Sequence, residues 1–99
     1  MKIKPGVDLR GVRPEIVVAM LLLEPVLLEH DSDFVVTSCT DGKHMAGSKH
    51  YEGLAIDVRS RNLPKERHTA CLIAMRETLG PQFDVILEGD HFHVEFDPK

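Results

Sequence analysis

Two short segments alternate apolar and titratable residues, and this alternation limits the folds that the chain can adopt. The segments are residues 54–59 and 91–96. In these two segments, every second residue is apolar, namely Leu54, Ile56, Val58, Phe92, Val94 and Phe96. The titratable side chains between them are Asp57, Arg59, His91, His93 and Glu95. A period of two is typical of a strand with one buried face and one wet face.

Two further segments are predicted to be strands. Residues 34–39 are rich in β-branched side chains. Residues 83–88 precede the segment 91–96, and Gly89 and Asp90 between them favour a tight turn, so the two segments should form an antiparallel hairpin. Strands with one wet face require helices on the other face.

Two helices are predicted to cover the apolar face of this sheet. Residues 16–30 form a mainly apolar segment in which the leucines at 21–23 are expected in the core. Pro25 would kink this helix or divide it in two. A second helix is expected to open at residues 62–64 and to end at Gly80. The prediction is an α+β fold with a small antiparallel sheet of about four strands and helices packed on one face.

Length and composition indicate one domain over residues 1–99. The chain has 16 acidic and 12 basic residues, and its net charge of −4 argues against a nucleic-acid partner. No apolar run is long enough for membrane insertion, and we expect no signal peptide. Cys39 and Cys71 lack the paired spacing of a disulfide framework and are expected to be buried free thiols. A monomer is the simplest expectation.

His50, Asp57 and His93 provide the donors of a zinc site. Catalytic zinc takes three protein ligands from His, Asp or Glu and keeps one position for water. Asp57 and His93 share the wet face of the predicted sheet. His50 lies in a long polar loop that can fold over this face if the chain turns at Gly53. The sequence therefore predicts a Zn²⁺ cofactor.

Residues near this set are candidates for moving protons and for support. A general base beside the metal would be Asp90 or Glu88, and Asp90 is preferred because the predicted turn leaves it free to lean toward the metal. His91 shares a face with the ligand histidine, so it is a candidate second proton donor or oxyanion ligand. Glu95 is expected to hold a ligand imidazole or to pair with Arg59.

Two motifs resemble those of zinc peptidoglycan peptidases. SKHYEGLAID at residues 48–57 resembles the family signature S-x-H-x-x-G-x-A-x-D. DHFHVE at residues 90–95 resembles its second motif, in which an acidic residue stands three positions before a ligand histidine. The family includes D-alanyl-D-alanine carboxypeptidases and phage L-alanyl-D-glutamate endopeptidases, and its fold is shared with lysostaphin-type enzymes and the hedgehog signalling domain. The resemblance covers residues 35–96.

The resemblance implies a role for each matching residue. The implied zinc ligands are His50, Asp57 and His93. Asp90 matches the general base, Ser48 matches a serine that supports a ligand or the substrate, and His91 matches a catalytic histidine of the lysostaphin branch. The family often has a substrate-binding arginine after its first strand, which this chain lacks. The candidate substitutes are Lys43, His44 and Arg59.

The implied function is hydrolysis of an amide bond in the peptide stem of peptidoglycan. Endopeptidase and carboxypeptidase activity both remain open, as do a phage and a bacterial origin. Such a protein would be made in the cytoplasm and would act at the bacterial cell wall, after release or as part of a virion. The alternatives are a non-catalytic zinc-binding module and a phage structural component with the same fold.

Overall fold

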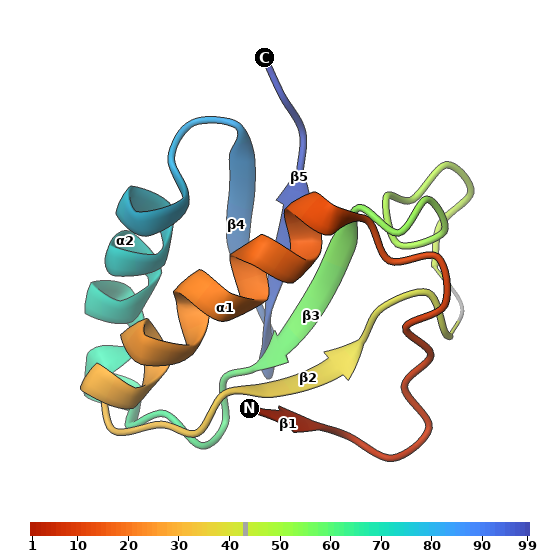
Figure 1. Cartoon of the computed structure of the whole chain (residues 1–99). Helices are drawn as coiled ribbons and strands as arrows, with labels where there is room; N and C mark the ends of the chain where they lie inside the picture. Colours follow the sequence, from red (N-terminus) through yellow and green to blue (C-terminus); the bar gives the residue numbers. More distant parts are fainter. Residues whose placement is uncertain (43) are drawn as a thin grey trace.

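The computed structural model describes residues 1–42 and 44–99 and contains one sheet with two α-helices on the same side of it (Figure 1). The elements in chain order are β1 (Lys2–Ile3), α1 (Pro14–Glu29), β2 (Val35–Ser38), β3 (Ala55–Arg59), the 3₁₀ turn η1 (Lys65–Arg67), α2 (His68–Leu79), β4 (Phe83–Glu88) and β5 (His91–Phe96). The α+β class and the helices on one face are therefore confirmed. The predicted strands agree with β2, β3, β4 and β5 to within one residue at each end.

The sheet differs from the prediction at one edge. Its strand order is β1-β2-β3-β5-β4, and β1 runs parallel to β2, whereas the other neighbours are antiparallel. The described residues thus form a mixed sheet of five strands rather than an antiparallel sheet of about four. The prediction missed β1 because Lys2 and Ile3 are too few to show any periodicity; they are paired with Val35 and Val36.

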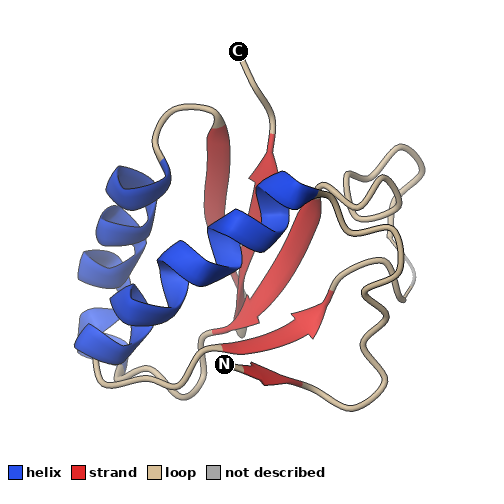
Figure 2. Ribbon diagram, in the orientation of Figure 1, coloured by secondary structure: helices blue, strands red, loops and turns tan. Residues whose placement is uncertain are grey.

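The register of β3 and β5 positions the wet face. Asp57 lies opposite His93, and Arg59 lies opposite His91. Ile56 and Val94, on the other face, are fully buried in the core between sheet and helices. The alternation in the sequence therefore predicts correctly which side chains face the helices. Helices and strands are distinguished by colour in Figure 2, where the wet face lies behind the sheet.

Helix α1 crosses the sheet as one continuous helix through Pro25, so of the two expectations for this position, a kink or a division, the division is wrong. The expectation that the leucine run lies in the core is also wrong for two of its members. Leu23 is buried, but Leu21 and Leu22 are 62% and 45% exposed. Residues 21–23 span about 200° around a helix axis, so a helix that packs on one side cannot bury all three.

The second helix starts later than predicted. The 3₁₀ turn η1 follows Pro64, and α2 begins only at His68. Its end is as predicted, since Gly80 takes a φ of +84° directly after the last helical residue. Cys39 and Cys71 are free and buried, as expected. Within residues 1–42 and 44–99, no helix is long and apolar enough to cross a membrane.

Candidate metal centre

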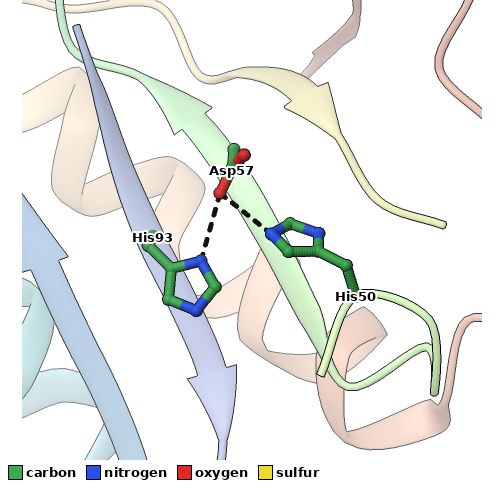
Figure 3. Close-up of side chains that lie close together, drawn as sticks. All are labelled: His50, Asp57 and His93. Carbon is green, nitrogen blue, oxygen red and sulfur yellow. Dashed lines mark hydrogen bonds and ion pairs between the residues drawn. The ribbon is translucent and has the colours of Figure 1, made fainter. Parts of the chain in front are cut away.

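The three predicted ligands come together on the wet face of the sheet (Figure 3). His50 reaches over from its loop, Asp57 projects from the middle of β3, and His93 projects from the neighbouring β5. Nε2 of His50 and Nδ1 of His93 each lie 3.2 Å from the same oxygen, Oδ1 of Asp57. One donor atom from each residue falls within 4.8 Å of the others. His50 is buried, and the other two side chains are half-buried.

Both imidazole rings are oriented by a partner on the side away from this centre. His50 Nδ1 donates to the carbonyl oxygen of Cys39 at 2.7 Å. His93 Nε2 donates to the carboxylate of Glu95 at 2.7 Å. Each ring therefore directs its other nitrogen toward Asp57, the side on which a metal ion would bind. Metal-binding histidines are held in this way, by a carbonyl or carboxylate behind the ring.

The chemistry and spacing of these donors fit a zinc ion. Two imidazole nitrogens and a carboxylate oxygen are a ligand set that Zn²⁺ accepts, and a fourth position would remain for water. In a tetrahedral zinc site with bonds of about 2.0–2.1 Å, ligand atoms lie about 3.3 Å apart. The two separations of 3.2 Å from Asp57 Oδ1 agree with that value. His50, Asp57 and His93 could therefore hold a metal ion.

The ionisation of Asp57 is coupled to that of the two histidines. Burial alone would raise the pKa of Asp57, but hydrogen bonds with His50 and His93 outweigh burial and lower that pKa well below its usual range. The hydrogen bond to Asp57 raises the pKa of His93 to about 9, against burial and with help from Glu95. Without a metal, a proton on His93 thus balances the carboxylate. A metal ion would displace that proton.

A tight turn at Gly53 brings His50 to the sheet. Gly53 has a φ of +73°, and its amide donates to the carbonyl of His50. Its own carbonyl accepts from Arg13 at the start of α1, at 2.9 Å. A Cβ at this position would lie 2.0 Å from the backbone oxygen of Gly11. The close approach of two backbone segments therefore requires glycine here, as the sequence indicated for the turn.

Hydrogen bonds from the backbone to the side chains of Ser48 and Asp41 stabilise the loop that carries His50. The hydroxyl of Ser48 accepts from the backbone N–H of His50 at 3.2 Å, so this serine supports a ligand residue. One carboxylate oxygen of Asp41 accepts from the backbone N–H groups of Cys39 and Asp8, both at 2.9 Å. Asp41 thereby fixes the segment whose carbonyl orients His50. This role of Asp41 was not predicted from the sequence. The signal was available, because an aspartate among turn-forming residues commonly accepts hydrogen bonds from nearby backbone N–H groups.

His44 packs beside the cluster but does not join it. Its ring stacks on that of His50 with centroids 3.8 Å apart, and its Nε2 donates to the carbonyl of Asp41 at 2.9 Å. The hydroxyl of Tyr51 donates to the carbonyl of His44 and accepts from its N–H. His44 is thus held as a wall of the site. Lys43, the other loop candidate, lies outside the described residues.

The predicted proton-transfer residues lie next to one another at the turn between β4 and β5. His91 Nδ1 lies 3.3 Å from Asp90 Oδ1, and His91 Nε2 lies 3.9 Å from Asp57 Oδ1. The hydrogen bond with His91 lowers the pKa of Asp90, which is exposed and hence ionised. Glu88 is paired with His91 across the hairpin. Both acids remain candidates for the base.

Two hollows meet at the cluster and share Asp57 and His91. The cationic cleft, of about 210 Å³, includes the side chains of Lys4, Thr37, Ser38, Arg59 and Arg61 in its lining. The open groove, of about 510 Å³, includes those of His44, Ser48, Lys49, Glu88 and Glu95. Arg59 therefore belongs to the cleft and does not pair with Glu95, whose partner is His93. Asp90 lines the cleft, whereas Glu88 lines the groove.

The comparisons with known proteins leave the family open. No protein-family model matches the chain, and no curated protein matches it significantly. The site itself and the motifs that it contains therefore provide the observations that bear on function.

Proposed function

We propose that the protein is a zinc-dependent peptidase that hydrolyses an amide bond in the peptide stem of peptidoglycan. The observation that carries the proposal is the cluster of His50, Asp57 and His93. A carbonyl or carboxylate behind each imidazole orients it, and its second nitrogen lies 3.2 Å from one carboxylate oxygen. A structural zinc site is closed by four protein ligands, whereas this cluster has three and opens to two hollows. That difference favours catalysis.

The two motifs support the choice of substrate. The residues that resemble the motifs of zinc peptidoglycan peptidases lie on the antiparallel strands β3 and β5, in the turn before β5 and in the loop before β3, which supports the proposal. The mixed sheet with helices on one face is compatible with the fold shared by D-alanyl-D-alanine peptidases, lysostaphin-type enzymes and the hedgehog domain, and we propose that fold for the chain. The site of action would be the bacterial cell wall, reached after release or on a virion.

Each side chain around the cluster has a proposed task. When bound, Zn²⁺ supplies a water of lowered pKa and polarises the scissile carbonyl. Asp90, kept ionised by His91, accepts the proton of the attacking water and passes it to the leaving amine. His91 donates a hydrogen bond to the oxyanion that develops. Glu88 is the alternative base, because it faces the same histidine across the hairpin.

The experiment is hydrolysis of purified cell-wall sacculi by the metal-loaded protein, with the released amino groups and peptides identified by mass spectrometry. We expect new amino groups in the stem peptide with the wild type and none with His93→Ala. His30→Gln, a histidine change at the end of α1 away from the site, should retain activity and zinc. Full zinc content and full activity in His93→Ala would refute the proposal. Zinc binding without hydrolysis would instead indicate a binding module or a structural component.

A further inference from the structure

The side of α1 that faces away from the sheet is apolar along its whole length. This helix lies across the front of the molecule in Figure 1, so its outward side meets the solvent. Five aliphatic side chains on that side are 40–62% exposed, namely Val17, Val18, Leu21, Leu22 and Leu28. Single exposed aliphatic residues are ordinary on soluble proteins, whereas a contiguous apolar patch marks an interaction surface. The outward side of α1 therefore needs a partner.

The exposed residues of α1 repeat at the spacing of two packed helices. An outer stripe is formed by Pro14, Val18, Leu21, Pro25 and Leu28, which are all exposed. Its members follow one another at intervals of four, three, four and three residues. This alternation keeps a row of side chains on one side of a helix and is the pattern by which two helices pack along their length. The outer stripe is thus suited to a second helix.

The two ends of α1 carry opposite charges without partners in the fold. Arg13 directly precedes the helix, Glu29 is its last residue, and both are exposed. Within residues 1–42 and 44–99, neither has an opposite charge within 4.0 Å, whereas the nearby Asp31 pairs with Arg67. An antiparallel copy of α1 would place the arginine of each helix beside the glutamate of the other, and a parallel copy would bring like charges together. The charges therefore favour a second copy of this chain as the partner.

A lipid surface matches this helix less well. Helices that lie on membranes are typically rich in Lys and Arg on their polar side. Helix α1 contains no basic residue and three glutamates, Glu15, Glu24 and Glu29. Anionic lipids would repel these carboxylates, so the helix is better suited to a protein surface.

We propose that the protein forms a two-fold symmetric dimer in which the α1 helices of two copies pack antiparallel along the outer stripe, in place of the monomer expected from the sequence. With the two-fold axis at Leu21, this residue meets its own counterpart. In the same register, Pro14 meets Leu28 of the second copy, and Arg13 meets Glu29 of the second copy. One register therefore satisfies both the apolar stripe and the charges at its ends.

This arrangement leaves both metal centres open. The wet face of each sheet lies on the side away from the helices and would point outward in the dimer, so the inference does not depend on the peptidase proposal. A helix of 16 residues is about 24 Å long. A contact of that length is small beside the roughly 1,200–2,000 Å² of stable interfaces, so the dimer should dissociate on dilution.

The first test is sedimentation equilibrium from micromolar to millimolar protein. The mass of the wild type should rise from that of a monomer toward that of a dimer. Leu21→Glu places two carboxylates at the two-fold axis and should remain monomeric. The matched control is Ile86→Glu, which changes a 48% exposed residue opposite His93 on the wet face and should dimerise like the wild type. A wild type that is monomeric throughout would overturn the inference, and so would dimers that survive Leu21→Glu. A monomeric wild type that binds phosphatidylglycerol vesicles would overturn it in favour of a lipid surface.

The second test examines the orientation of the helices. Arg13→Glu and Glu29→Arg should each weaken the dimer about tenfold, because like charges then meet at both ends, and the double variant should restore it. Leu21→Cys should form a disulfide between copies with oxidised glutathione, since Cys39 and Cys71 are buried and do not compete. Leu28→Cys should not cross-link to itself, because its two copies would lie about 20 Å apart at 1.5 Å per residue. Cross-linking of Leu28→Cys to itself, or a double variant as weak as the single ones, would overturn the antiparallel dimer.

Discussion

Replacing Gly53 by alanine tests how the ligand loop is held, and the structure provides a matched control in the same loop. Alanine at a positive φ costs about 1–2 kcal/mol. Gly53→Ala adds a Cβ that would lie 2.0 Å from the backbone oxygen of Gly11, so the two segments must move apart. Relief of such a contact costs about 1–3 kcal/mol, and loss of the hydrogen bond from Arg13 adds about 0.5–1.5 kcal/mol. Gly47 has a similar φ of +80° but nothing within 4 Å of its Cβ position.

The assay is urea unfolding of the metal-free protein, followed by zinc determination on the reloaded protein. Gly47→Ala should lower the free energy of unfolding by about 1–2 kcal/mol. Gly53→Ala should lower it by about 1.5–4.5 kcal/mol more, a large fraction of the stability of a domain of this size. It should also lose zinc, because the displaced turn carries His50 away from Asp57. Equal free energies for the two variants, or a full zinc content in Gly53→Ala, would refute this account of the loop.

Three further predictions concern the ions and protons of the site. Glu95→Gln removes the carboxylate that orients His93 and should weaken zinc binding about tenfold, measured in competition with a chromophoric chelator. Glu66→Gln on η1 should not change the zinc affinity. Equal zinc affinities for the two variants would contradict the role of Glu95 in orienting His93. In the metal-free protein, the contribution of His93 to the free energy of unfolding is complete below the ordinary histidine pKa of 6.5 and is lost as pH rises through about 9. The free energy of unfolding, measured by urea titration, should therefore fall between these two pH values. A free energy that does not change over this range would contradict a stabilising pair of protonated His93 and Asp57. Asp90→Asn should keep the zinc content and abolish turnover, and a loss of zinc would reassign Asp90 to metal binding.

The sequence predicts the strands well because their signal is local. The alternation in β3 and β5 depends only on which side chains face the helices, and the hairpin turn at Gly89 requires only a short connection. Helix α1 shows the limit of this reasoning. Its sequence is apolar on all sides, so periodicity could not indicate which of Leu21, Leu22 and Leu23 is buried. Only the direction in which the sheet lies decides that, and this is a property of the whole fold.

The candidate metal centre was predictable in its residue types but not in its supports. His50, Asp57 and His93 follow from spacing and strand faces, and the structure brings them together as expected. The carbonyl of Cys39 behind His50 is a backbone group, which residue identity does not reveal. The cationic cleft depends on β1, because its pairing with β2 brings Lys4 to the wet face. A two-residue strand that the sequence did not indicate therefore adds a positive charge beside the site.

The most direct test of the central claim is the metal content of the purified protein, measured by elemental analysis beside His50→Ala and Asp57→Ala. The account predicts about one zinc per chain in the wild type and much less in both variants, since each removes one of three donors. Little zinc in a wild type supplied with it during expression would contradict the account. So would variants that keep their zinc, because the metal would then lie elsewhere.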